Sequence, residues 1–225
     1  MIKKKTFVLL FVMVSAFTMT SCISIVEKVL FKKDGGGTYS MTLDMSQIAS
    51  MMAAFSEGDN EMSQAFDEMN DEFEASRAKL ERVRGVSNVR QELDKETLIL
   101  TLLFDFEDVD ALNRGMSEYY HDEEEGAVQQ HVFFTQDRKS ITRTEKDVIG
   151  ESLKKEMASD EDEEVDLSMI LSDMYHETVL EFERDIKSFS NDNYRKDGNR
   201  VVRWRKYLFN KRDADRSLSV KVTTK

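Results

Sequence analysis

Short turns rich in Asp and Gly separate pairs of segments in which apolar and polar residues alternate. In the first pair, the run Asp34-Gly35-Gly36-Gly37 joins residues 25–31 to residues 38–44. Alternation with a period of two is typical of β-strands, and Gly supplies the positive φ that tight hairpins demand. We therefore expect a β-hairpin here. A glycine loop that cradles phosphate would need a helix directly after it, and a strand pattern follows instead.

Three further pairs of segments show the same alternation, and we expect each to close as a hairpin. The predicted pairs are 86–93 with 97–106, 129–134 with 140–145, and 200–207 with 217–222, and residues 178–182 form one more strand. The sequence contains no proline, so its turns depend on Gly, Asn and Asp. Because each hairpin closes locally, a single sheet is the simplest arrangement.

Segments with helical periodicity lie between these hairpins. The predicted helices begin at Asp44, at Glu61, at Asp108 or Asp110, at Val148 and at Val165. In the second, apolar residues recur every three or four positions as far as Val83, and Gly85 is placed to end it. Its polar face is mixed rather than rich in Lys and Arg, which favours packing against a sheet over a membrane surface. Together, the predicted hairpins and helices indicate an α+β fold with a mostly antiparallel sheet built from hairpins and flanked by amphipathic helices.

The N-terminus has the pattern of an export signal. Lys3, Lys4 and Lys5 precede an apolar run at residues 7–17, and small residues lead to Cys22. The run is shorter than the roughly 20 apolar residues that a transmembrane helix needs. Cys22 is the only cysteine in the sequence, so the chain can form no intrachain disulfide.

The segment Met19-Thr20-Ser21-Cys22 resembles the lipobox of bacterial lipoproteins. The resemblance implies cleavage before Cys22, attachment of a diacylglycerol to its thiol, and acylation, commonly with palmitate, of the new amino group. We expect a signal peptide at residues 1–21 and one globular domain at residues 22–225. The expected location is the cell envelope, with the domain anchored by lipid to the outer membrane and facing the periplasm. Burial of acyl chains contributes about 0.8 kcal/mol per methylene, so two or three chains anchor stably.

Short motifs along the rest of the chain resemble the LppM-like domain of bacterial lipoproteins. In order, they are the Asp34-Gly35-Gly36 hairpin, Gly85-Val86, Phe104-Asp105-Phe106 before Leu112-Asn113, Ser190-Asn191, Asp197-Gly198, and Trp204 before the last strand. The resemblance implies a lipid-anchored α+β domain, with lipid or glycolipid as a possible ligand, and it supplies no catalytic residues. Members usually carry a transmembrane segment after the domain. In this sequence no apolar run follows the domain motifs up to Lys225, so we expect Cys22 to be the only anchor.

The charge of the chain is strongly acidic and unevenly spread. The formal net charge is −12, and removal of residues 1–21, which contain three Lys and no acid, changes it to −15. This charge argues against nucleic acid as a partner. The acidic runs 122–125 and 160–164 are expected to be solvated loops, with calcium binding as the sharper alternative. The basic segment 193–225 is a candidate contact for anionic head groups or an acidic partner.

The sequence contains none of the common catalytic or nucleotide-binding motifs. We expect His121, His131 and His176 to be ordinary surface residues rather than metal ligands, and Trp204 to anchor the core with Arg203 and Arg205 facing water. No cofactor is expected. The resulting hypothesis is a non-enzymatic, membrane-anchored binding or assembly module for a lipid or a protein of the envelope. The alternative is a hydrolase that acts on an envelope polymer through paired carboxylates.

Overall fold

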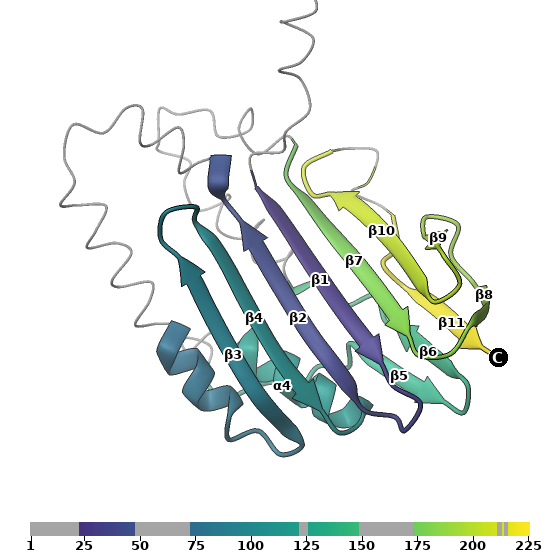
Figure 1. Cartoon of the computed structure of the whole chain (residues 1–225), viewed down its shortest axis with the longest axis horizontal. Helices are drawn as coiled ribbons and strands as arrows, with labels where there is room; N and C mark the ends of the chain where they lie inside the picture. Colours follow the sequence, from purple (N-terminus) through teal and green to yellow (C-terminus); the bar gives the residue numbers. More distant parts are fainter. Residues whose placement is uncertain (1–22, 48–72, 122–125, 149–172, 211–212, 214–215) are drawn as a thin grey trace, which may run out of the picture.

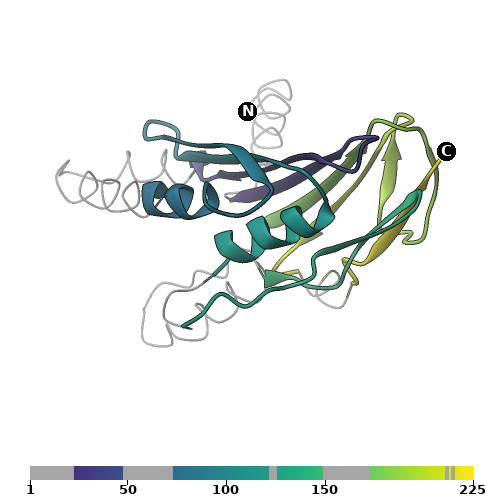
Figure 2. The same cartoon turned by 90° about the horizontal axis from the view of Figure 1, so that it is seen from below.

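Two β-sheets and a helix pack against a common hydrophobic core (Figures 1 and 2). The computed structural model describes residues 23–47, 73–121, 126–148, 173–210, 213 and 216–225. In Figure 1, strands β5 and β6 and helix α4 (Val109–Tyr119) lie behind the larger sheet. Residues 73–80 form a further helical segment. The predicted α+β class is therefore confirmed.

The larger sheet has seven strands in the order β3-β4-β2-β1-β7-β10-β9. Their bounds are β1 Ser24–Phe31, β2 Gly37–Asp44, β3 Val86–Asp94, β4 Ile99–Phe106, β7 Tyr175–Phe182, β9 Arg195–Asp197 and β10 Val201–Tyr207. Neighbouring strands are antiparallel except β1 and β7, which run parallel with Ser24 beside Tyr175 and Phe31 beside Phe182.

The smaller sheet has four strands in the order β5-β6-β11-β8, all antiparallel. Their bounds are β5 Phe134–Asp137, β6 Ser140–Arg143, β8 Ile186–Phe189 and β11 Val220–Thr224. Figure 1 places the tip of the β1–β2 hairpin, the β5–β6 hairpin and the C-terminus at the same end of the molecule. The start of β1 lies at the opposite end.

Inward-facing side chains of both sheets form the core. Phe31 makes ring contacts with Phe106, Phe134 and Phe182, at centroid distances of 6.0, 5.6 and 5.4 Å. Phe134 belongs to the smaller sheet and the other three rings to the larger one, so this group joins the sheets. Burial of one such side chain stabilises the folded state by about 1.5–3 kcal/mol.

Helix α4 begins and packs as its sequence dictates. The Asp108 carboxylate accepts a hydrogen bond from the Ala111 amide at 2.7 Å, which confirms Asp108 as the N-cap. A Cβ atom at Gly115 would lie 2.9 Å from Cζ of Phe104. The absence of a side chain at Gly115 therefore lets the helix lie directly against β4.

Several sequence predictions are confirmed. The first two hairpins form close to where expected, and Leu100, Leu102, Phe104 and Phe106 are buried on one face of β4. Leu98 is also buried, but it lies in the turn before Ile99, where β4 begins, with a φ of +53°. Strand β7 covers the predicted residues 178–182 and begins three residues earlier. The acidic runs 122–125 and 160–164 and most of the predicted helices at 44–55, 61–84, 148–157 and 165–175 lie outside the described residues.

Other predictions are wrong. The chain builds two sheets rather than one, and β10 does not pair with the segment 217–222. One edge of β10 pairs with β7 and the other with β9, so β11 joins the smaller sheet instead. The third hairpin begins at Phe134, because residues 129–133 form no strand. Tyr175 starts a strand rather than ending a helix.

Gly85 does not end the helix before β3. The helical segment stops at Leu80, and Gly85 has a φ of +83° in the turn that enters β3. Its positive φ satisfies that turn, which explains why a glycine stands there.

Candidate functional site

The predicted lipidation site, Cys22, lies outside the described residues. It is two positions before Ser24, the first residue of β1, so covalent geometry keeps it close to the start of that strand. No helix in the described part of the chain is long and apolar enough to cross a membrane.

A small pocket with a strongly basic rim lies where the two sheets meet. Its volume is about 60 Å³. Five cationic residues line it: Lys32, Lys33, Arg138, Lys139 and Arg184. Phe31, Phe182 and Ile141 are buried beneath them. We call this site the cationic pocket.

Backbone hydrogen bonds fix the loops that carry these cations. The Lys32 amide donates to the Gly36 carbonyl at 2.8 Å, which closes the tip of the β1–β2 hairpin. The Lys33 amide donates to the Glu183 carboxylate at 2.9 Å, which ties that tip to the loop carrying Arg184. On the other side, the Thr224 amide donates to the Lys139 carbonyl at 2.9 Å. The pocket rim is therefore held in place by three separate segments.

Arg138 occupies a backbone conformation that non-glycine residues rarely adopt. Its φ is +47°, in the two-residue turn between the paired residues Asp137 and Ser140. A left-handed conformation costs an L-residue about 1–2 kcal/mol, and Gly or Asn usually takes such a position. An arginine here contributes a cation to the pocket rim despite that cost.

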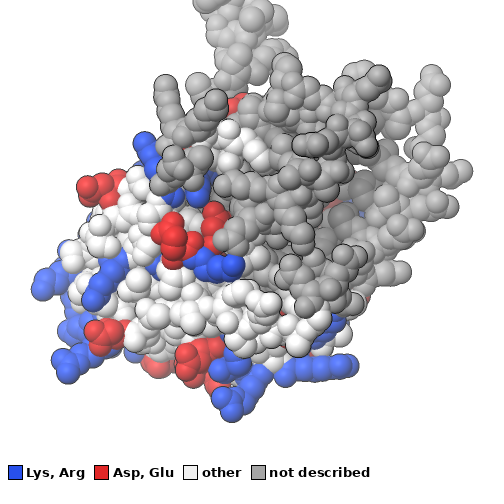
Figure 3. All heavy atoms as spheres, turned by 180° about the vertical axis from the view of Figure 1, so that it is seen from behind, with Lys and Arg blue, Asp and Glu red and all other residues white. Residues whose placement is uncertain are grey.

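Among the described residues of the segment 193–225, six of the nine basic side chains form ion pairs with carboxylates. Arg203 and Arg205 form ion pairs with Glu177 at 3.6 and 3.0 Å, and Lys206 pairs with Asp147 at 3.3 Å. These pairs argue against the β10 arginines as the contact for anionic groups. Figure 3 shows Lys and Arg side chains projecting along the left and lower margins of the described surface.

The five cations of the cationic pocket differ from the ion-paired basic residues of the segment 193–225. Among the described residues, none of the five side chains lies within 4.0 Å of a carboxylate oxygen as an ion pair. Sequence reasoning missed this site. The signal was present as two basic pairs, Lys32-Lys33 and Arg138-Lys139, at the tips of two predicted hairpins.

An acidic cleft lies on the other side of the β1–β2 hairpin. It has a volume of about 520 Å³, and its lining includes Asp34, Asp105 and Glu107 together with Lys32, which also lines the cationic pocket. Hydrogen bonds from Asn88 at 2.8 Å and from Thr38 at 2.7 Å lower the pKa of Asp105, with burial opposing them. A general acid of a hydrolase needs a raised pKa, so Asp105 is poorly suited to that role.

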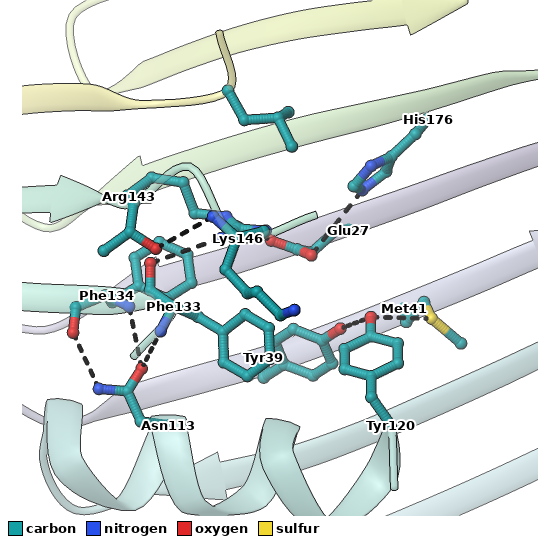
Figure 4. A network of polar contacts seen from close by, with 12 residues as sticks. Glu27, Tyr39, Met41, Asn113, Tyr120, Phe133, Phe134, Arg143, Lys146 and His176 are labelled. Atoms are coloured by element: carbon teal, nitrogen blue, oxygen red, sulfur yellow. Dashed lines mark hydrogen bonds and ion pairs between the residues drawn. The ribbon is translucent and has the colours of Figure 1, made fainter. Parts of the chain in front are cut away.

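Three ionisable side chains are buried together between the sheets. Glu27 on β1 lies 3.5 Å from Nε of Arg143 on β6 and 3.8 Å from Nε2 of His176 on β7 (Figure 4). Their exposed fractions are 1%, 2% and 1%. We call these residues the Glu27 cluster. The prediction of a surface position for His176 is therefore wrong, since its side chain faces inward on β7.

The Arg143 guanidinium is the best-contacted member of the Glu27 cluster. It donates to the carbonyl oxygens of Phe133 and Lys146, at 3.4 and 3.0 Å, and lies over the rings of Phe133 and Phe134. By contrast, both carboxylate oxygens of Glu27 and both ring nitrogens of His176 are buried and have no hydrogen-bond partner among the residues that the structure describes. Burial lowers the pKa of His176, and the Glu27 charge only partly opposes this shift.

Polar groups next to the Glu27 cluster are hydrogen-bonded. The hydroxyl groups of Tyr39 and Tyr120 lie 2.8 Å apart, and burial raises the pKa of both well above the usual value (Figure 4). None of these residues, nor any member of the cluster, lines the cationic pocket or the acidic cleft. The arrangement is that of a polar group inside a packed core.

The remaining predicted residues are placed as follows. Trp204 is 5% exposed and packs against Tyr194 at 5.7 Å, which confirms it as a core anchor, and Arg203 and Arg205 are partly exposed. His121 and His131 are partly exposed. In the described part of the chain, no group of three or more His, Cys, Asp or Glu residues could hold a metal ion.

Comparisons with known proteins identify a structural neighbour. No protein-family model and no curated protein matches the chain. The fold is similar to the NMR structure of the folded domain of LppM from Mycobacterium tuberculosis, with a TM-score of 0.40 and 10% sequence identity over 93% of this chain and 92% of that one. Membership of the LppM-like family and the lipobox remain predictions from the sequence.

Proposed function

We propose that the protein is a lipid-anchored module of the bacterial cell envelope that binds an anionic group of its ligand without catalysing a reaction. The cationic pocket is the observation that carries this proposal. Five cations line one site, and among the described residues none of their side chains forms an ion pair with a carboxylate within 4.0 Å, although the Glu183 carboxylate lies at the rim and Lys32 also faces the acidic cleft. Such a concentration of one charge favours binding of the opposite charge.

The anchor rests on the sequence. A charged start, a short apolar run and a single cysteine directly after it favour export and lipidation at Cys22. Only one residue separates Cys22 from β1, so the domain would be held directly at the membrane. The formal net charge of −12 disfavours a general attraction of the chain to anionic lipid, and the acyl chains would supply the attachment.

The non-enzymatic role rests on where the ionisable groups lie. The Glu27 cluster is enclosed by core residues, and hydrogen bonds lower the pKa of Asp105 in the acidic cleft, which disfavours it as a general acid. A binding module requires only the cationic pocket, which the folded loops already shape.

The anchor is tested by mass spectrometry of the protein purified from membranes. We expect a mature chain that begins at Cys22 and carries a diacylglycerol and an amide-linked fatty acid. The variant Cys22→Ser should lose the lipid and move to the soluble fraction, while Ser24→Ala, two positions later, should stay with the membrane. An unmodified Cys22 in the wild-type protein would contradict the proposal.

A further inference from the structure

We infer that the cationic pocket binds a phosphate group presented from the aqueous side, away from the leaflet that holds Cys22. This inference rests on the proposed function and specifies both the chemistry of the ligand and the direction from which it arrives.

The charge of the cationic pocket favours phosphate over a carboxylate. A phosphate monoester carries a charge of about −1.5 to −2 at neutral pH and offers three strong acceptor oxygens. Lys and Arg side chains form their shortest and strongest hydrogen bonds with such oxygens. Cations that come from three different segments can surround a tetrahedral group, whereas a planar carboxylate presents only two oxygens.

The volume limits what enters the cationic pocket. Sites for drug-sized ligands enclose about 300–1,000 Å³. The cationic pocket measures about 60 Å³, which suits one small group and not an acyl chain. The rest of the ligand must therefore stay outside, so the site recognises a terminal phosphate or the free ion.

The position of the cationic pocket relative to the anchor determines the side from which the phosphate group arrives. Cys22 precedes the first residue of β1, and Phe31, the last residue of that strand, lies in the pocket floor. The eight residues of β1 are separated by seven steps of about 3.3 Å, so its two ends lie roughly 23 Å apart. Figure 1 shows the hairpin tips at the end of the sheet opposite the start of β1.

At that separation, the charges of the head groups in the anchoring leaflet are screened from the cationic pocket. Exposed charges are screened over about 8 Å at physiological ionic strength. With β1 directed away from the bilayer, as this inference requires, a pocket roughly 23 Å along the strand from the anchor lies well beyond this range. Head groups of the anchoring leaflet therefore neither fill the pocket nor repel its ligand.

The test uses the full lipid-bearing protein in phosphatidylcholine vesicles, titrated with inorganic phosphate by calorimetry. We expect saturable phosphate binding that acetate at equal ionic strength does not compete away. Addition of phosphatidylglycerol to the same vesicles should change the phosphate affinity by less than about twofold, because the pocket lies beyond the screening length.

The test variant is Lys33→Gln with Arg138→Gly, and the matched control is Lys187→Gln with Lys221→Gln. Both remove two cations, and the control cations are exposed and lie outside the pocket. The test variant should bind phosphate about tenfold more weakly or worse, because it loses charge-assisted hydrogen bonds. Its unfolding midpoint should not fall, since Gly adopts a positive φ without steric cost. The control should bind like the wild type.

The outcomes separate this inference from the proposed function. Phosphate binding that depends on Lys33 and Arg138 but is competed away by phosphatidylglycerol in the host vesicle would overturn the direction and leave the binding function intact. Tighter binding of acetate than of phosphate would overturn the ligand class alone. If neither anion binds, or if both variants bind equally, the cationic pocket is not a binding site and the proposed function fails as well.

Discussion

Glu27 is a carboxylate at a position where its neighbours on the same face of β1 are apolar. Ile25, Val29 and Phe31 share its inward face. The charge is tolerated there because Arg143 supplies the opposite charge from the smaller sheet. A buried ion pair contributes little net stability, but removal of one partner leaves an uncompensated charge.

This asymmetry gives a prediction for a double-mutant cycle. Glu27→Leu alone should lower the free energy of unfolding by about 3–5 kcal/mol, because the Arg143 charge stays buried without a counterion. Glu27→Leu combined with Arg143→Met should lose much less than the sum of the two single losses. Urea unfolding of the four proteins measures the coupling. Additive losses would show that the two side chains do not depend on each other.

His176 predicts a pH dependence of stability. Burial lowers its pKa in the folded protein, whereas the unfolded chain should titrate near the ordinary value of about 6.5. Below that pH the unfolded state binds more protons than the folded state, so stability is lost as pH falls. The contribution of His176 is fully present above about pH 6.5 and decreases below it by at most about 1.4 kcal/mol per pH unit.

The variant His176→Gln isolates this effect. Its loss of unfolding free energy between pH 7.5 and pH 5.5 should be about 1 kcal/mol or more smaller than that of the wild type, because one proton-linked group is gone. His131→Gln serves as the control, since His131 is partly exposed. Identical pH profiles for wild type and His176→Gln would contradict the buried neutral imidazole.

At the scale of elements, Asn113 joins helix α4 to the start of β5. Its side-chain oxygen accepts hydrogen bonds from the amides of Phe133 and Phe134, each at 2.9 Å, and its amide donates to the Phe134 carbonyl at 2.8 Å. The Asn113 side chain thus satisfies backbone groups of Phe133 and Phe134 that a neighbouring strand would otherwise pair with, where the chain enters the core.

Replacement of Asn113 by Ala should therefore cost more than an ordinary helix substitution. Each buried polar group left without a partner costs about 1–3 kcal/mol, so we expect a loss of about 2–4 kcal/mol in unfolding free energy. Glu118→Ala, on the partly exposed face of the same helix, should change it by about 0.5 kcal/mol or less. Thermal and urea unfolding provide the measurement, and equal losses for the two variants would exclude the proposed role of Asn113.

The elements that could be predicted from the sequence are those with local signals. The Asp34-Gly35-Gly36-Gly37 turn and the alternation around it predict β1 and β2, and Asp108 predicts the start of α4. Strand β8 and the pairing of β11 depend on contacts between distant segments, which a sequence pattern does not encode.

The same limit applies to the candidate site. Lys32-Lys33 and Arg138-Lys139 each stand at a visible turn, but only the packing of one sheet against the other brings them to one pocket. The burial of His176 likewise depends on Glu27 and Arg143, which lie on other strands. The sequence pattern around His176 carries no sign of these partners, so it led to the wrong prediction of a surface position.

At the scale of the whole molecule, the predicted anchor and the cationic pocket lie at opposite ends of the domain. The start of β1 lies next to the predicted lipid anchor, and the hairpin tips at the other end carry the cationic pocket (Figure 1). The core between them, joined by the ring contacts of Phe31, holds this separation fixed.

A crystal structure of the protein grown with a stoichiometric amount of tungstate, a heavy tetrahedral oxyanion that stands in for phosphate, tests the binding site directly. The account predicts anomalous density for one oxyanion in the cationic pocket, within hydrogen-bond distance of side chains among Lys33, Arg138 and Arg184. Density only at the β10 arginines or elsewhere on the surface, with the cationic pocket unoccupied, would contradict it.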